Sequence, residues 1–146
     1  MIAFDTQPRI QVELARPEDE PALRRLLREA PMPGRVKLSL EREPDYFFAA
    51  DVEGETSHVV IARDTRLEEI VGIGSRSVRP RYVNGRLTRI GYLSQLRVAE
   101  RCRGQRRILV EGYETLDRTR CAEEASFDLT TILADNTTAR RLLTAG

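Results

Sequence analysis

Residues 92–111 read YLSQLRVAERCRGQRRILVE, a strand pattern that runs through a loop of arginine and glycine directly into a helix pattern. The first turn of a helix has backbone N–H groups without intrahelical acceptors, and the helix dipole places partial positive charge there. From Arg76 to Arg107 there are ten arginines and one acid, Glu100, so ten positive charges against one negative leave +9 in a chain of net charge +1. A helix start flanked by guanidinium groups is typical of a phosphate or pyrophosphate site.

The composition limits the size and class of the protein. With 146 residues, 40% hydrophobic and 32% charged, residues 1–146 are expected to form a single domain, and a multidomain enzyme is excluded for this chain. The sequence has no apolar stretch long enough to cross a bilayer, and its first residues, MIAFDTQPRI, lack the order of a signal peptide, so a cytoplasmic location is expected. Cys102 and Cys121 form no CxxC pair and His58 is the only histidine, which predicts neither a disulfide framework nor a metal site.

The hydrophobic and turn patterns predict an α/β (α+β) fold with a mixed, mostly antiparallel sheet flanked by helices. Strands are recognised by alternation or by β-branched residues, and helices by apolar residues every three or four positions. Asn84-Gly85 is a strong hairpin signal, so the middle of the chain is expected to be an antiparallel meander. The expected order is β-α-α-β-β-β-α-β-α, with strands at Ile10–Leu14, Ser57–Arg63, Glu69–Arg79, Leu87–Val98 and Ser126–Leu133, and helices from about Pro17 to Pro31, over Asp45–Val52, from about Gln105 to Arg120 and after Asn136.

Some single residues have predicted local roles. The aromatic side chains of the short helix, Tyr46, Phe47 and Phe48, are assigned to the core. Gly112 is expected to permit close approach of its helix to the sheet, and either Asp135 or Asn136 is expected to cap the last helix.

The strand before the arginine-rich loop is irregular. Ser94 interrupts an otherwise apolar side of the strand, and Leu93 is apolar out of phase. A β-bulge near Leu93–Gln95 would explain this, and it would free backbone N–H and C=O groups for an extended, amide-bearing ligand. Alternatively, Leu93 covers the second face of a sheet that has helices on both sides. The pattern leaves both interpretations open.

This arrangement resembles the GCN5-related N-acetyltransferase (GNAT) family. The family's cofactor segment is a strand ending in an LxV-type sequence, then Arg or Gln, two residues, Gly, one residue, and Gly or Ala at a helix start. Here it reads Leu96-Arg97-Val98 followed by Arg101-Cys-Arg-Gly104-Gln-Arg106, and the family's Asn-x-x-Ala helix reads Asn136-Thr-Thr-Ala139. The resemblance covers nearly the whole chain and implies an acyl-CoA N-acyltransferase-like fold with acetyl-CoA as cosubstrate and no metal.

The resemblance also implies where acetyl-CoA binds. The pantetheine amides are expected to pair with backbone near Leu96–Val98, and the pyrophosphate with the backbone amides of Gly104–Arg107. Asn136 is expected either to face the cofactor or to cap its helix. The expected cofactor-binding residues are Leu96, Arg97, Val98, Arg101, Arg103, Gly104, Gln105, Arg106, Arg107 and Asn136.

The sequence departs from the family pattern at the places where catalysis is expected. Arg106 replaces a Gly or Ala, although a register that begins at Arg103 is an alternative. Where many members have a carboxylate to accept the amine proton, this chain has Ser94 and Gln95, and neither is a base near neutral pH. Leu143 stands where a tyrosine often acts as general acid. A water chain through Ser94 and Gln95, or alternatively Tyr92, is therefore the candidate proton route.

Three functions are consistent with these residues. The first is an N-acetyltransferase that moves an acetyl group to a primary amine of a small molecule or peptide, and the second is a noncatalytic acyl-CoA-binding or regulatory module. A nucleic-acid-binding module is third, because only Tyr82 and Tyr92 lie among the arginines and no nucleic-acid motif is present.

The family fold continues into two further strands, whereas this sequence ends at Gly146, just after the last expected helix. We therefore expect a C-terminally truncated form of the fold, the N-terminal part of a longer protein, in which strand Ser126–Leu133 has an open edge. Such an edge is expected to be covered by a second copy, as a homodimer, or by another chain or domain.

Overall fold

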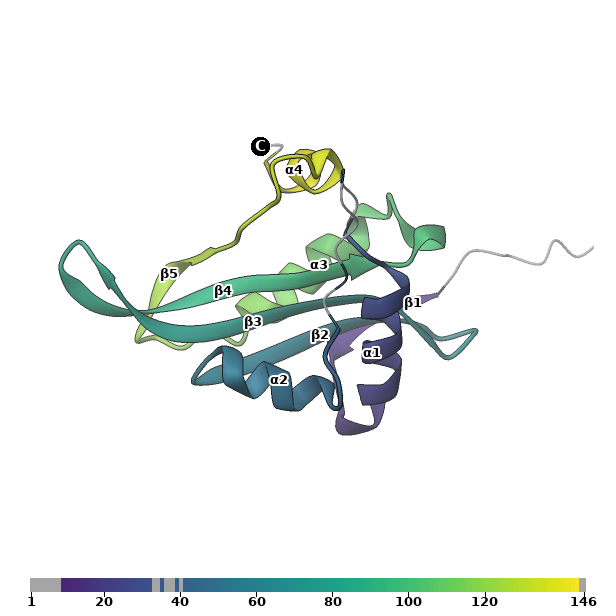
Figure 1. The fold of residues 1–146 in the computed structure, drawn as a ribbon, viewed down its shortest axis with the longest axis horizontal. Coiled ribbons are helices and arrows are strands. Elements are labelled where there is room, and N and C mark those ends of the chain that lie inside the picture. The colour runs from purple at the N-terminus through teal and green to yellow at the C-terminus, as the bar shows by residue number, and fades with distance from the viewer. Residues whose placement is uncertain (1–8, 33–34, 36–38, 40, 145–146) are drawn as a thin grey trace, which may run out of the picture.

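A five-stranded mixed sheet forms the centre of the molecule (Figure 1). The computed structural model describes residues 9–32, 35, 39 and 41–144. The strands lie in the order of the sequence, and each is antiparallel to the next except β4 and β5, which are parallel. The strands are β1 (Ile10–Leu14), β2 (Thr56–Asp64), β3 (Glu69–Val83), β4 (Arg86–Val98) and β5 (Glu124–Leu129).

Helices cover both faces of this sheet. Figure 1 shows α1 and α2 on one face and α3, the crossover between β4 and β5, on the other. The predicted order β-α-α-β-β-β-α-β-α is confirmed, with two short 3₁₀ turns in addition, at Pro17–Asp19 and Glu100–Cys102. The helices are α1 (Glu20–Glu29), α2 (Tyr46–Glu53), α3 (Arg106–Asp117) and α4 (Thr137–Thr144). None of the helices in the described part of the chain is long and apolar enough to span a membrane.

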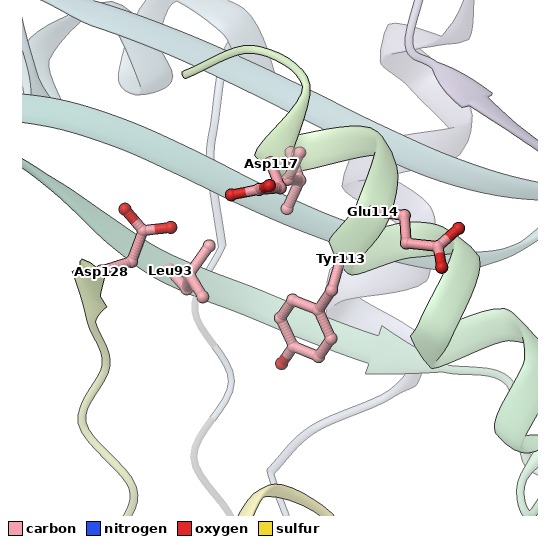
Figure 2. A pocket seen from close by; sticks show the side chains of 6 residues that line it. Leu93, Tyr113, Glu114, Asp117 and Asp128 are labelled. Carbon is pink, nitrogen blue, oxygen red and sulfur yellow. The ribbon is translucent and has the colours of Figure 1, made fainter. Parts of the chain in front are cut away.

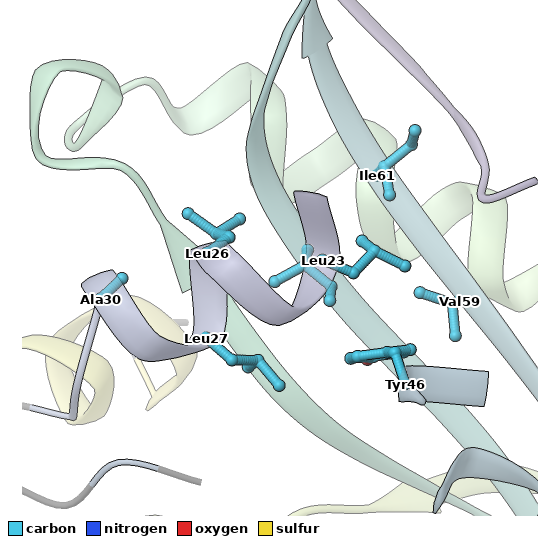
Figure 3. Packing of buried hydrophobic residues seen from close by; sticks show 8 residues of the cluster. Leu23, Leu26, Leu27, Ala30, Tyr46, Val59 and Ile61 are labelled. Atoms are coloured by element: carbon cyan, nitrogen blue, oxygen red, sulfur yellow. The ribbon is translucent and has the colours of Figure 1, made fainter. Parts of the chain in front are cut away.

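The larger core lies between the sheet and α1 (Figure 3). Leu23, Leu26 and Leu27 lie on one side of α1 and pack with Tyr46 and Ile61. Burial of one leucine side chain contributes about 1.5–3 kcal/mol, so this cluster fixes α1 on the sheet.

The aromatic residues of α2 do not all enter this core. Tyr46 is fully buried and Phe47 packs against the cluster, but Phe48 is 69% exposed. The prediction that all three are core residues was wrong for Phe48, because consecutive residues of a helix point in different directions around its axis.

A smaller core lies under α3, where Ile108 and Cys102 pack with Val71. The close approach predicted at Gly112 is not observed, since a Cβ added there would meet nothing within 4 Å. On β3, a Cβ on Gly72 would lie 3.1 Å from Cβ of Ala62 but 3.5 Å, an ordinary van der Waals distance, from Cγ2 of Ile108. The tight contact at Gly72 is therefore with the neighbouring strand β2 and not with α3.

The β3–β4 hairpin turns at the predicted dipeptide. Asn84 and Gly85 have φ values of 49° and 77°, as the two central residues of a type I′ turn require. This confirms the antiparallel meander in the middle of the chain.

Candidate cofactor site

The strand β4 contains a bulge next to the predicted ligand-binding segment. Ser94 pairs with Ser75 of β3, and the next pair is Arg97 with Ile73. The chain therefore advances three residues on β4 and two on β3 between these pairs, so β4 has one extra residue. Gln95 adopts a left-handed backbone with φ 59°, which is uncommon for a residue other than glycine. The predicted irregularity is confirmed, although it lies between Ser94 and Arg97. Leu93 does face α3 (Figure 2), so both interpretations of the pattern hold.

The pairing between β4 and β5 stops at the same level. The parallel ladder ends at Tyr92↔Leu129, and side-chain contacts follow, among them a hydrogen bond from Thr130 Oγ1 to the carbonyl oxygen of Leu93 at 2.9 Å. Beyond it, the chain diverges from β4 toward α4 (Figure 1). The strand predicted to extend to Leu133 therefore ends at Leu129.

This divergence leaves one edge of β4 open. Within the described residues, the segment from Ser94 to Val98 has β3 as its only strand neighbour. Alternate backbone N–H and C=O groups along such an edge can pair with an extended ligand that carries amides.

A buried cluster of charged residues fixes β5 to β4. The Arg76 side chain, 0% exposed, donates to Glu124 Oε2 at 2.5 Å and to Asp128 Oδ1 at 3.0 Å. Arg120 approaches from beyond α3 and donates to Asp128 Oδ2 at 2.9 Å. Gly91 makes room for this cluster, since a Cβ there would lie 2.1 Å from Asp128 Oδ1. The cluster therefore sets the position from which the two strands diverge.

This cluster has no local signature in the sequence. Arg76 resembles the other arginines of the basic segment there, but its side chain is paired internally and contributes no basic surface. Burial by itself lowers the pKa of Arg76, whereas its hydrogen bonds to Asp128 and Glu124 raise it and prevail.

The loop after β4 leads to a helix start without a side-chain cap. Gly104 has φ 86°, a left-handed conformation that glycine adopts without strain, and the side chain of Gln105, which precedes the helix, makes no capping hydrogen bond. The α3 helix begins at Arg106. The N–H groups of its first turn, at Arg106 and Arg107, have no acceptor within the helix and are oriented for an anion.

All four loop arginines expected to contact phosphate are exposed: Arg101, Arg103, Arg106 and Arg107. Arg103 Nε donates weakly to the carbonyl oxygen of Val98 at 3.4 Å, and Arg107 Nε donates to Glu111 Oε1 at 2.5 Å. Since such exposed contacts contribute little free energy, these side chains are able to turn toward a ligand.

Arg101 differs from the other three. It donates to Asp64 at 2.8 Å and to Glu69 at 3.0 Å, and so ties the loop to the β2–β3 hairpin. Its hydrogen bond to Asp64 raises the pKa of Arg101 and lowers the pKa of Asp64. The structure thus gives Arg101 a bracing contact within the protein.

The three residues of the LxV-type sequence have separate surroundings. Val98 packs against the small core under α3, and the register opposite Ile73 places Arg97 on the other face. Arg97 Nη1 donates to the carbonyl oxygen of Leu96 at 2.7 Å, and burial lowers the pKa of Arg97. The backbone of Leu96 lies in the bulge itself.

A second polar group, formed by Arg42, Glu53 and Tyr46 on the α2 side of the sheet, was not predicted from the sequence. Arg42 pairs with Glu53 and lies 4.8 Å over the ring of Tyr46. Burial raises the pKa of Tyr46 to about 12, and its hydroxyl has no partner among the described residues. Because these residues come from α2 and the segment before it, no local pattern pointed to them.

Two candidate residues of the proton route, Ser94 and Gln95, lie at the bulge, and Tyr92 lies two residues before it. Ser94 Oγ is 3.0 Å from Ser75 Oγ, and the buried Oε1 of Gln95 has no partner in the described part of the structure. Tyr92 is 38% exposed, and its hydroxyl lies 2.5 Å from Thr131 Oγ1. The last of these contacts links β4 to the segment that follows β5.

Asn136 caps α4. Its Oδ1 accepts a hydrogen bond from the Ala139 amide at 3.1 Å, which confirms the capping alternative. The neighbouring Asp135 instead accepts a bond from the Arg35 amide at 2.9 Å.

Comparison with known proteins identifies the fold. No protein-family model matches the chain, and no curated protein matches it in sequence. Solved structures do match: a glucosamine-6-phosphate N-acetyltransferase from Arabidopsis thaliana has 11% identity and a TM-score of 0.60, over 92% of this chain and 90% of that chain. A ribosomal-protein-alanine N-acetyltransferase from Brucella melitensis has 17% identity and a TM-score of 0.63, over 93% and 89%.

A third similar structure contains a cofactor analogue. It is AAC(6')-Iy in complex with a bisubstrate analog, CoA-S-monomethyl-acetylneamine, with 18% identity and a TM-score of 0.61, over 94% of this chain and 88% of that chain. At such identities the likeness establishes the fold alone. The sheet, the divergence of β4 from β5 and the structural matches together show that this chain has the GNAT acetyltransferase fold, with five strands in its described part.

Proposed function

We propose that this chain is an acetyl-CoA-dependent N-acetyltransferase that transfers an acetyl group to a primary amine. The observation that carries the proposal is the continuity of β4, its bulge and the uncapped start of α3. One uninterrupted segment offers an open strand edge at Leu96–Val98 and unpaired amides at Arg106 and Arg107. These are the groups that the pantetheine amides and the pyrophosphate of coenzyme A require.

In the proposed complex, the cofactor lies along the open edge of β4. Its pyrophosphate accepts hydrogen bonds from the first turn of α3 and from Arg103, Arg106 and Arg107, which are exposed beside it. The pantetheine arm runs back toward the bulge. Arg97 is buried and Arg101 is bonded to Asp64, so these two arginines support the backbone of the site and do not contact the cofactor.

Transfer requires a neutral amine, stabilisation of the oxyanion and a path for one proton. The amine nitrogen attacks the thioester carbonyl carbon, the C–S bond breaks, and the departing thiolate takes up the proton that the amine releases. A backbone N–H freed by the bulge at Gln95–Leu96 serves the oxyanion. Water held by Ser94, Gln95 and the Tyr92 hydroxyl carries the proton, since none of these groups is a base near neutral pH.

A noncatalytic acyl-CoA-binding module is the second candidate. It is favoured by the side chains at the bulge, where Ser94 bonds to Ser75 and Gln95 provides an amide rather than a carboxylate. The nucleic-acid alternative has less support, because Arg76 is buried and paired with acids, and the charge of the exposed Arg101 is balanced by Asp64.

Three related expectations belong to this proposal: a single domain, a cytoplasmic location and a covered β5 edge. Among the described residues, β5 has β4 as its only strand neighbour, and Phe127 and Leu129 are 45% and 50% exposed. A further strand from a second copy or another chain would pair there. Light scattering at high protein concentration distinguishes self-association from a monomer.

Calorimetric titration with acetyl-CoA tests the proposal. We expect micromolar binding that weakens at least about tenfold in an Arg103→Ala/Arg106→Ala double variant, because two charge-assisted contacts are lost. The matched control is Arg81→Ala/Arg86→Ala, which removes the same charge from exposed positions in the β3–β4 hairpin and should bind normally. Equal weakening in both variants would indicate general electrostatic attraction, and no binding by the unaltered protein would refute the proposal. Turnover with an amine panel then separates the enzyme from the noncatalytic module.

A further inference from the structure

A hollow lies between α3 and the base of the divergence of β4 and β5 (Figure 2). It has a volume of about 340 Å³, equivalent to about ten water molecules. It is shallow and largely open to solvent. Its lining consists of Leu93, Tyr113, Glu114, Leu116, Asp117 and Asp128.

The lining combines an apolar floor with acidic walls. Leu93 and the buried Leu116 provide the floor, and burial raises the pKa of Tyr113, which keeps its hydroxyl neutral. Asp117 and Asp128 both accept hydrogen bonds from Arg120, so they are held in place, and no basic side chain belongs to the lining. A neutral, apolar group suits this hollow, whereas a carboxylate would approach three others.

The position of the hollow relates it to the proposed cofactor path. Leu93 directly precedes the bulge and lies five residues before Val98, about 17 Å along an extended strand. Tyr113 lies seven residues after the start of α3, about 10 Å along the helix axis. A ligand whose phosphates lie at that helix start, and whose arm follows the open edge of β4, therefore directs its far end into the hollow.

We infer that the hollow receives the acyl group of the cosubstrate, and that this chain prefers neutral straight-chain acyl groups longer than acetyl. The inference rests on the proposed function. Acetyl fills only a small part of 340 Å³, whereas butyryl and hexanoyl groups cover the apolar floor of Leu93 and Leu116. Succinyl-CoA, of similar length, is disfavoured because its carboxylate would leave water for a lining without a basic side chain, whose three acids are already paired with Arg76, Arg118 and Arg120.

Calorimetric titration with coenzyme A and its acetyl, butyryl, hexanoyl and succinyl thioesters tests this inference. Each methylene removed from water raises affinity by up to about fourfold, so butyryl-CoA should bind about tenfold more tightly than acetyl-CoA. Succinyl-CoA should bind no better than acetyl-CoA. If coenzyme A binds but chain length has no effect, or succinyl equals butyryl, the inference is wrong and the proposed function stands. If no form binds, both are wrong.

A variant locates the effect in the hollow. Leu93→Phe fills the floor and should reduce the butyryl-to-acetyl ratio to about two or less, while free coenzyme A binds as before. Leu87→Phe is the matched control, since Leu87 lies on the same strand, is 64% exposed and is outside the hollow; its ratio should remain about ten. An unchanged ratio in Leu93→Phe would overturn the assignment. Should that variant fail to fold, the series on the unaltered protein decides alone.

Discussion

Replacement of Gly91 by alanine should disrupt the attachment of β5 to β4. A Cβ at Gly91 would lie 2.1 Å from Asp128 Oδ1 and 2.7 Å from both Nε and Nη2 of Arg76. The backbone itself tolerates alanine, because Gly91 does not have a positive φ. The added methyl group therefore acts through these two side chains alone.

The size of the effect follows from their burial. The Arg76 and Asp128 side chains are 0% and 9% exposed, so they have little room to move aside. Breaking a buried ion pair destabilises by about 3–5 kcal/mol, from which partial relaxation and a gain of about 0.4–1 kcal/mol from restricting the unfolded chain are subtracted. We expect a net loss of about 2–3 kcal/mol.

Urea unfolding of Gly91→Ala measures this loss, and Gly112→Ala is its matched control. The control makes the same chemical change where a Cβ meets nothing within 4 Å, inside α3, and should stabilise the protein by about 0.8–1 kcal/mol through helix propensity. A Gly91→Ala protein within 0.5 kcal/mol of the parent in its free energy of unfolding would refute the role of the cluster. Destabilisation by Gly112→Ala would mean that the surroundings of α3 are described incorrectly.

Three further perturbations have defined outcomes. Tyr46 has a pKa of about 12 in the folded state against about 10 when unfolded, so the free energy of unfolding should fall by about 2–3 kcal/mol as pH rises from 10 to 12. Urea unfolding of Tyr46→Phe should not show this fall. The same fall in the variant and the parent would contradict the prediction. Arg101 lowers the pKa of Asp64, so the pair stabilises the fold above the ordinary carboxylate pKa, and this contribution is lost as pH falls through the folded-state pKa. The free energies of unfolding of the parent and of Arg101→Ala should therefore differ above that pH and converge below it. Asn136→Ala removes a cap contributing about 1 kcal/mol and should speed hydrogen exchange at Ala139, whereas Asn136→Asp should preserve protection.

Local chemistry explains which features the sequence predicted. The bulge was detectable because Leu93 and Ser94 break a period of two, and the helix start because Gly104 and the arginines precede an apolar repeat. The cap by Asn136 was likewise a property of four consecutive residues. In each case, residues close in the sequence determine the backbone conformation.

The features that the sequence did not reveal depend on distant partners. Arg76 and Asp128 are 52 residues apart, and Arg101 and Asp64 are 37 apart. All the arginines looked equivalent as basic residues, yet the fold buries Arg76 completely and ties the exposed Arg101 to a buried Asp64.

The central claim is that coenzyme A lies along β4 and at the start of α3. The most direct test is to record amide chemical shifts of isotope-labelled protein while acetyl-CoA is added. The account predicts saturable shifts at Leu96–Val98 and Gly104–Arg107, with little change at Asn84 and Gly85 in the distant hairpin. Shifts confined to that hairpin, or none at all at millimolar acetyl-CoA, would contradict it.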